Sequence, residues 1–213
     1  MKSSLSALVL VLIAAISPLA GATVIASSSG LASFTKSVNF SAPALAANTT
    51  VTNQFSASGL TFSALSGGGI RANSCGTGFW NSYTGFAGDF LNTYGPNCST
   101  NASIDAFSMK FAYDVSAASF GLYTYGTNTI KAYNDGVLVE QYTAANTRSF
   151  LTFSNVVFDE LRFNEGGASN YFVLDNVAYQ KANVVPEPGA LALFGLGLAG
   201  LAALRSKAAK KSA

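Results

Sequence analysis

Alternation of apolar and polar residues runs through the middle of the chain and predicts β-strands. Leu60 and Phe62 alternate with polar neighbours, and five apolar residues alternate with polar or small ones between Phe107 and Val115. A side-chain period of two is that of a strand with one buried face. No stretch between residues 23 and 183 has a convincing helical period of 3.6. The middle of the chain is therefore expected to fold as β-structure.

The expected strands are short and are separated by turn residues. They lie around Val38 and Phe40 and over residues 60–63, 107–115, 120–125, 130–133, 137–142, 150–153, 156–163 and 171–179. Asn134-Asp135-Gly136 between two of them is a strong signal for a tight hairpin turn. This spacing is typical of a β-sandwich, and we expect a jelly-roll-like antiparallel β-sandwich over residues 23–183. The sequence leaves the strand order open.

The first 22 residues have the organisation of a secretory signal peptide. Lys2 precedes the apolar run 5–16, and the small residues 20–22 form an A-x-A cleavage site. We expect cleavage after Ala22 and export of the rest of the chain. The alternative is a membrane anchor, but the apolar run is short and the cleavage site follows it directly.

The C-terminus combines three features in a fixed order. Pro186-Glu187-Pro188 is followed by an uncharged apolar stretch over 189–204 and by a basic tail over 205–213 that begins at Arg205. Sixteen residues form a helix of about 24 Å, which is marginal for a hydrocarbon core of about 30 Å unless flanking basic side chains snorkel. The positive-inside rule keeps the basic tail cytoplasmic and leaves the body outside. We therefore expect a single transmembrane helix at about 189–204.

The region 184–213 resembles the PEP-CTERM sorting signal. The matching residues are Pro186, Glu187, Pro188, the apolar stretch from Gly189 and Arg205. The resemblance implies that the protein is a substrate of an exosortase-type membrane enzyme, reaches the cell surface or is secreted after processing, and accompanies exopolysaccharide and biofilm production. It does not fix the activity of the body. The simpler alternative is a single-pass anchor with a proline-containing linker.

Composition excludes several classes of function. The 213 residues carry a net charge of +2 without a basic cluster outside the two ends, which argues against nucleic-acid binding. The absence of histidine removes Ser-His-Asp and Cys-His catalysis and histidine metal sites. Residues 23–184 hold seven basic and nine acidic residues, so capture of an anionic polymer by simple electrostatics is not expected. We expect no catalytic set and predict that the protein is not an enzyme.

The two cysteines are expected to form a disulfide. Cys75 and Cys98 are the only pair in an exported chain, and their spacing fits neither a redox nor a zinc motif. The bond would close a loop that is too polar and glycine-rich to order itself. Loop entropy predicts a contribution of roughly 3–4 kcal/mol.

The same loop holds the candidate binding residues. Trp80, Tyr83, Asp89 and Tyr94 combine flat aromatic rings with polar groups, a chemistry that suits stacking on a sugar and bonding to its hydroxyls. The alternative is that Trp80 and Phe79 close one end of the sandwich as part of the core. The polysaccharide site at this loop is therefore a hypothesis.

Asp175 lies inside an apolar strand and needs a partner, because an unpaired buried charge is costly. The possible partners are Arg148 or Arg162, backbone N–H groups, or a calcium ion of the kind that carbohydrate-binding jelly rolls hold near their last strand. No D-x-D-x-D-G loop is present. Apart from this possible calcium we expect no cofactor.

Three functions remain open. The first is an exported surface or matrix protein, sorted through its tail, whose body binds polysaccharide. The second is an extracellular carbohydrate-active enzyme, with acidic pairs drawn from Glu140, Glu160 and Glu165 and several aspartates. The third is a structural matrix protein without a ligand.

Overall fold

The body is an antiparallel β-structure, as the alternation predicts. The computed structural model describes residues 22–73, 83–93, 106–165, 172–183 and Gly197. Over these residues ten strands join into one sheet. Their bounds are β1 Thr23–Ser27, β2 Lys36–Val38, β3 Leu60–Ala64, β4 Arg71–Ala72, β5 Leu91–Asn92, β6 Phe107–Thr124, β7 Thr127–Asn134, β8 Val137–Ala145, β9 Arg148–Phe163 and β10 Phe172–Lys181, with one 3-10 turn at Ser56–Ser58.

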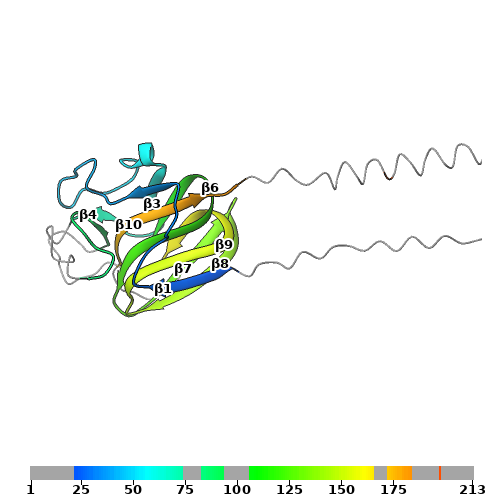
Figure 1. Cartoon of the computed structure of the whole chain (residues 1–213). Helices are drawn as coiled ribbons and strands as arrows, with labels where there is room; N and C mark the ends of the chain where they lie inside the picture. The colour runs from blue at the N-terminus through cyan, green and yellow to red at the C-terminus, as the bar shows by residue number, and fades with distance from the viewer. Residues whose placement is uncertain (1–21, 74–82, 94–105, 166–171, 184–196, 198–213) are drawn as a thin grey trace, which may run out of the picture.

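The two longest strands belong to both layers of the fold. The first part of β6 pairs with β3 and with the end of β9, and its second part pairs with β10 and with the start of β9. Register shifts around Val115 mark the place where β6 and β9 bend from one layer into the other (Figure 1). One layer holds β3, β7, β8 and the adjoining ends of β6 and β9. The other, here called the β10 layer, holds β1, β2, β4, β5, β10 and the remaining halves of β6 and β9.

Aromatic side chains from the two layers meet in the core. Phe107 stacks on Phe163 with 4.5 Å between ring centroids, and both rings belong to the β3–β7 layer. Phe163 in turn meets Phe120 and Phe172 of the β10 layer, at 5.5 Å each. All of these residues are completely buried. The body is therefore a sandwich of two packed layers, and the finer jelly-roll assignment stays a prediction.

In two places, two strands that were expected separately form one continuous strand. Residues 107–115 and 120–125 were expected as two strands but form one, β6, and the expected strands at 150–153 and 156–163 form β9. In β6 the residues that belong to the main hydrophobic core are odd-numbered up to Val115 and even-numbered from Ala118 to Leu122. A bulge inserts an extra residue and shifts the phase of alternation, which makes one long strand look like two.

The chain ends lie at one end of the sandwich. Thr23 in β1 pairs with Ser154, Ser154 with Ala117, and Ala117 with Gln180 near the end of β10. This row crosses the β10 layer at what we call the terminal end, on the right in Figure 1. The opposite end, where β10 begins, is called the loop end. It contains the β6–β7 turn and residues Tyr83 and Thr93.

The membrane-targeting predictions fall largely outside the described residues. These are the signal peptide at 1–22, the apolar stretch at 189–204 apart from Gly197, and the basic tail. Among the described residues, no helix has the length and apolar content needed to cross a bilayer. The transmembrane helix therefore stays a prediction.

Candidate ligand-binding groove

A bulge in the middle of β10 positions the candidate site. The partners of β10 on β6 shift register between Asp175 and Ala178, and Asn176 has a left-handed φ of 47°. Leu174 and Val177 both face the core across this shift. The extra residue turns Asn176 toward the outer face of the β10 layer. Bulges of this kind commonly re-aim side chains beside functional sites.

Asp175 and Asn176 fasten the segment 83–90 to the outer face. The Ala87 N–H donates to Asp175 Oδ2 at 2.8 Å, and Asn176 Nδ2 donates to the Gly85 carbonyl at 2.9 Å. Asp175 also accepts a hydrogen bond from the Asn176 N–H at 2.7 Å. This arrangement, here called the clasp, holds together two parts of the chain about 90 residues apart.

Two glycines make the close approach of the clasp possible. A Cβ on Gly121 would lie 2.0 Å from the Gly85 carbonyl oxygen, which no real contact allows. Gly85 has a φ of +93° and a Cβ there would lie 2.8 Å from the Gly121 Cα. The segment 83–90 therefore lies directly on the backbone of β6.

The surroundings of Asp175 determine the pKa of its carboxyl and the partners that it finds. The residue is completely buried, and burial raises the pKa of its carboxyl to about 7, against the opposing effect of the N–H donors from Ala87 and Asn176. The nearby charge of Asp89 raises it further. Of the expected partners, the structure shows the backbone N–H groups. Arg148 lies instead over the rings of Tyr83 and Tyr123, and Arg162 pairs with Glu160 and Glu165.

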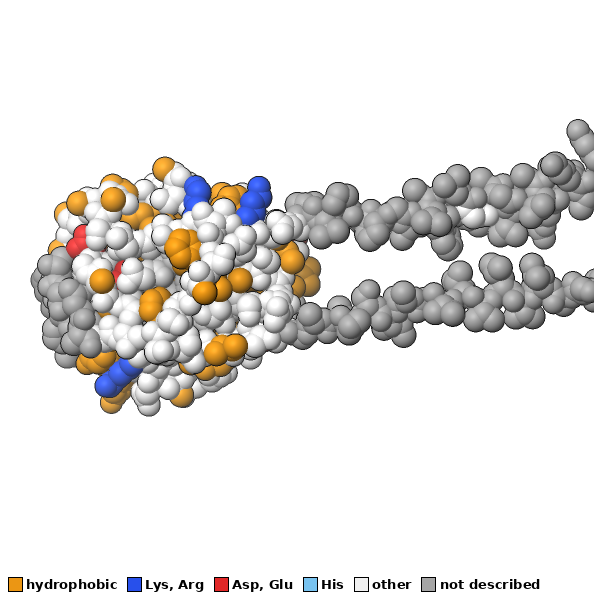
Figure 2. Space-filling model, viewed as in Figure 1, with side chains coloured by type: hydrophobic (Ala, Val, Ile, Leu, Met, Phe, Trp, Pro, Cys, Tyr) orange, Lys and Arg blue, Asp and Glu red, His pale blue; other side chains and the backbone are white. Residues whose placement is uncertain are grey.

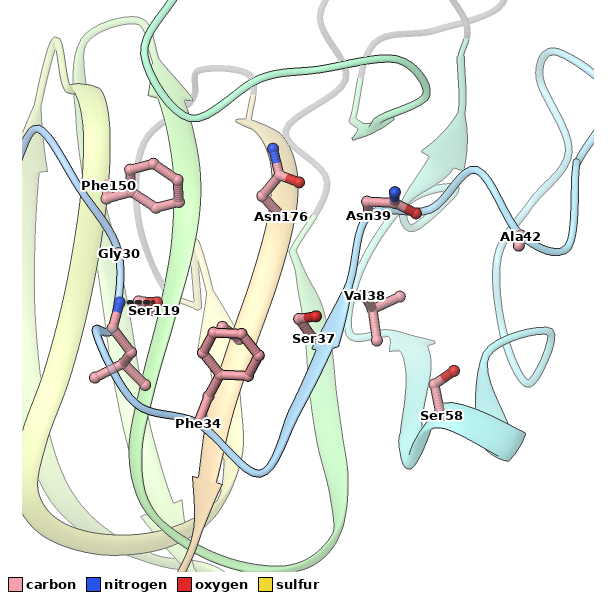
Figure 3. A pocket seen from close by; sticks show the side chains of 12 residues that line it. Gly30, Phe34, Ser37, Val38, Asn39, Ala42, Ser58, Ser119, Phe150 and Asn176 are labelled. Carbon is pink, nitrogen blue, oxygen red and sulfur yellow. Dashed lines mark hydrogen bonds between the residues drawn. The ribbon is translucent and has the colours of Figure 1, made fainter.

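A groove lies next to the clasp, between the outer face of the β10 layer and the segment 30–39. Its volume is about 570 Å³. Figure 3 shows Phe150 and Asn176 entering from the strands and Phe34, Ser37 and Asn39 from the segment opposite. The Leu31 N–H donates to Ser119 Oγ at 2.9 Å and fixes that segment to the floor.

The groove is uncharged. None of the twelve described residues that line it is acidic or basic. The ring of Phe34 is 48% exposed, and Phe150 is half-buried at the opposite wall. The groove therefore offers apolar ring faces together with amide and hydroxyl groups. Charged side chains are also sparse on the face of the molecule shown in Figure 2.

The predicted loop site is only partly within the described residues. Trp80, Tyr94 and both cysteines, Cys75 and Cys98, lie outside them, so the disulfide and these ligand contacts stay predictions. Tyr83 is half-buried and meets Tyr123 at 5.0 Å. Asp89 is half-buried, and its N–H lies 3.5 Å from Ser41 Oγ.

Trp80 and Phe79, for which a core role was the alternative, lie outside the described residues, but two other aromatic residues of the loop pack on the sheet. Phe86 and Phe90 are buried against Tyr123 and Val173, in a small cluster on the outer face that Tyr83 adjoins. These rings fix the segment 83–90 to the sheet. They supply packing energy and no free ring face.

The three glutamates considered for catalysis have structural partners. Glu160, which is 3% exposed, and Glu165 each pair with Arg162, at 3.1 and 3.0 Å. Hydrogen bonds from Tyr133, Arg162 and Lys131 outweigh the effect of burial and lower the pKa of Glu165, whereas a general acid needs a raised pKa. Glu140 accepts a hydrogen bond from the Gln141 N–H at 2.7 Å.

Metal binding by Asp175 is not supported by further ligands nearby. Over the described residues, no group of three or more acidic, cysteine or histidine side chains is placed to hold a metal ion. The carboxylate already accepts hydrogen bonds from two backbone N–H groups. Calcium at Asp175 remains an untested prediction.

The groove residues were missed by the sequence reasoning. Phe34 and Asn39 lie in a stretch rich in Ser, Ala, Thr and Asn that shows little alternation, and Phe150 was placed in a strand without a role. Asn176 lies within the expected strand 171–179 and was given no role. An asparagine between apolar strand residues is the one signal that could have indicated the bulge, because asparagine tolerates a left-handed φ.

Comparison with known proteins identifies the C-terminal region. Residues 184–207 match the family model of the PEP-CTERM protein-sorting motif. The chain carries a PEP-CTERM sorting signal. The match includes Pro186, Glu187, Pro188 and Arg205, and confirms the resemblance seen in the sequence. A PEP-CTERM signal indicates an exported precursor that is processed by an exosortase.

The body in front of the PEP-CTERM signal is similar to solved carbohydrate-binding modules. A variant of the family 29 module CBM29-2 has 14% identity and a TM-score of 0.32, and the match covers 60% of this chain and 99% of the module. Another variant, complexed with mannohexaose, has 14% identity and a TM-score of 0.30, with coverage of 75% and 92%. No curated protein matches the chain. Similarity this low says nothing about the ligand of the present body.

Proposed function

We propose that the protein is a non-catalytic, exported polysaccharide-binding protein, displayed at the cell surface or released into an extracellular matrix after exosortase processing. The observation that supports binding is the uncharged groove beside the clasp, with two aromatic rings facing amide and hydroxyl groups. A link to exopolysaccharide and biofilm follows from the sorting signal as an expectation.

The chemistry of the groove favours a neutral sugar chain. Pyranose rings have an apolar face that stacks on aromatic side chains, and their hydroxyls exchange hydrogen bonds with amides. Phe34 and Phe150 supply the ring faces, while Asn39 and Asn176 supply the amides. A polymer rich in carboxylates would meet no cation among the described lining residues.

The enzyme alternative is disfavoured by the same geometry. Hydrolysis of a glycoside needs two carboxyl groups that reach one bond. Asp175 has the raised pKa of a candidate acid, but it is completely buried beneath the segment 83–90, where a sugar cannot reach it. The carboxylates of Glu160 and Glu165 are held by Arg162.

Affinity electrophoresis of the mature chain through gels containing neutral or uronic-acid polysaccharides tests the proposal. Binding of a neutral polymer is expected, and Phe34→Ala should weaken it roughly fivefold, since stacking on a half-exposed Phe ring contributes about 1 kcal/mol. Tyr125→Ala is the matched control, because Tyr125 is 56% exposed in the β6–β7 turn at the loop end.

The same assay distinguishes a polysaccharide-binding protein from a structural matrix protein without a ligand. Retardation that is equal for the wild type, Phe34→Ala and Tyr125→Ala would place binding outside the groove. Failure to bind any polymer, including the polysaccharide of the native host, would favour a structural matrix protein without a ligand.

A further inference from the structure

The distance between the body and the membrane is limited by the last strand. β10 ends at Lys181, and the Ala182 N–H still donates to the Asp114 carbonyl at 2.9 Å. The apolar stretch of the sorting signal begins at Gly189, six residues after Asn183. Six residues span at most about 20 Å. The tether cannot lengthen by fraying of β10, because Tyr179 near its end is completely buried.

This tether determines which end of the body can approach the lipid. Val115 to Thr124 of β6 runs from the terminal end to the loop end, about 30 Å at 3.3 Å per residue. An inverted body, with its loop end on the membrane, would hold Asn183 about 30 Å above the surface. A 20 Å tether forbids that orientation and leaves the terminal end nearest to the lipid.

The terminal end carries an exposed apolar patch. Val137, Leu138 and Val139 are consecutive residues at the start of β8 and are 65%, 48% and 37% exposed. Val157, at the turn of β9, is 43% exposed. We call these four residues the terminal patch. Figure 2 shows apolar side chains at this end of the molecule.

The residues of the terminal patch come from two elements that are joined. The Asp135 N–H in the β7–β8 turn donates to Asp159 Oδ1 at 3.2 Å, two residues after Val157. Tyr133, opposite Leu138 in β8, also pairs with Glu160 in β9. The turn is thus fixed against β9, and the patch keeps its shape without a ligand.

We propose that the terminal patch docks on the lipid surface while the sorting signal holds the body at the membrane. This inference rests on the proposed membrane attachment of the precursor, and it adds a contact site that the sorting signal does not contain. Exposed apolar patches bind interfaces, and a short tether raises the local concentration of the surface, so that even a weak contact is occupied. Asp135 and Asp159 flank the patch, which favours zwitterionic over anionic headgroups.

Hydrogen exchange of the mature full chain, residues 23–213, tests the proposal in phosphatidylcholine vesicles. Flotation with the vesicles first establishes that the chain is attached. The amides of 136–140 and 157 should then exchange roughly tenfold more slowly than in detergent-free solution without lipid, while the β6–β7 turn at 125–127 is unchanged. Leu138→Asp should abolish the protection at Val157. Leu65→Asp, at the loop end and 41% exposed, is the control.

Each outcome distinguishes this inference from the attachment itself. A chain that does not float with the vesicles contradicts membrane attachment. A chain that floats without slower exchange at the patch overturns the docking proposal alone. Protection that rises with protein concentration in the absence of vesicles means that a second copy covers the patch, and likewise overturns lipid docking.

Discussion

Gly121→Ala tests whether the clasp holds the segment 83–90 by close backbone contact. The new Cβ would lie 2.0 Å from the Gly85 carbonyl oxygen, and that oxygen belongs to the backbone and cannot rotate away. The φ of Gly121 lies outside the left-handed region, so the substitution adds no backbone strain of its own. The whole effect should therefore come from displacement of the segment.

The magnitude follows from the contacts that displacement breaks. The hydrogen bonds from Ala87 to Asp175 and from Asn176 to Gly85 are lost, and together they contribute roughly 2–4 kcal/mol. Phe86, which is buried, adds roughly 1.5–3 kcal/mol if its ring becomes exposed. Because β5 keeps its pairing with β10, we expect a partial loss of roughly 3–5 kcal/mol in the free energy of unfolding.

Urea unfolding and hydrogen exchange of Gly121→Ala provide the measurement, with Gly136→Ala as control. Gly136 has a φ of +78° and no atom within 4 Å of an added Cβ, so its substitution should cost only about 1 kcal/mol of backbone strain. Amides 85–90 should exchange faster in Gly121→Ala alone. If Gly121→Ala is no less stable than Gly136→Ala and amides 85–90 stay protected, the close contact does not hold the segment.

Three further predictions follow from the charges and the tail. The folded Asp175 carboxyl has a pKa of about 7 against 3.8 unfolded, so it holds its proton more tightly when folded, and the free energy of unfolding should fall by roughly 3 kcal/mol between pH 4 and pH 7. Urea titrations should show this slope in the wild type and its absence in Asp175→Asn. Arg162→Met leaves the buried Glu160 without its close cation, and the free energy of unfolding in urea should fall by roughly 2–4 kcal/mol. Lys110→Met is the control: Lys110 Nζ lies 3.8 Å from Glu160 Oε2 and its side chain is 54% exposed, so its loss should cost under about 1 kcal/mol. Deletion of residues 184–213 should shift the protein from the membrane and surface fractions to the soluble exported fraction of its host, and unchanged fractionation and intact mass would contradict sorting by this signal.

The strands were predictable where one face is buried and the other exposed. The β7–β8 hairpin lies where Asn134-Asp135-Gly136 placed it, with Asp135 and Gly136 both left-handed. The strand β1 was not predicted, because Thr23–Ser27 is short and its burial does not alternate clearly. Tyr125 was included in the expected strand 120–125, but β6 ends at Thr124 and Tyr125 is 56% exposed in the turn that follows.

The candidate site was less predictable than the fold because it depends on long-range contacts. Asp175 was recognised as a buried carboxylate in need of a partner, but its donor, Ala87, carries no side-chain signal in the sequence. Gly121 and Gly85 look like ordinary strand and turn glycines until their backbones are seen in contact. The groove likewise needs the segment 30–39 to cross β10, which no local pattern indicates.

Strand β10 links the proposed binding of sugar to the proposed position on the membrane. Its bulge presents Asn176 to the groove, and five residues later the strand ends where the tether begins. The groove lies on the side of the sandwich, along the outer face of the β10 layer, whereas the terminal patch lies on the end. A body that stands on the lipid through its terminal end therefore keeps the groove open to a polymer running along the membrane. Sugar binding and attachment to the membrane can then occur together, and exosortase processing would release a body whose groove is unchanged.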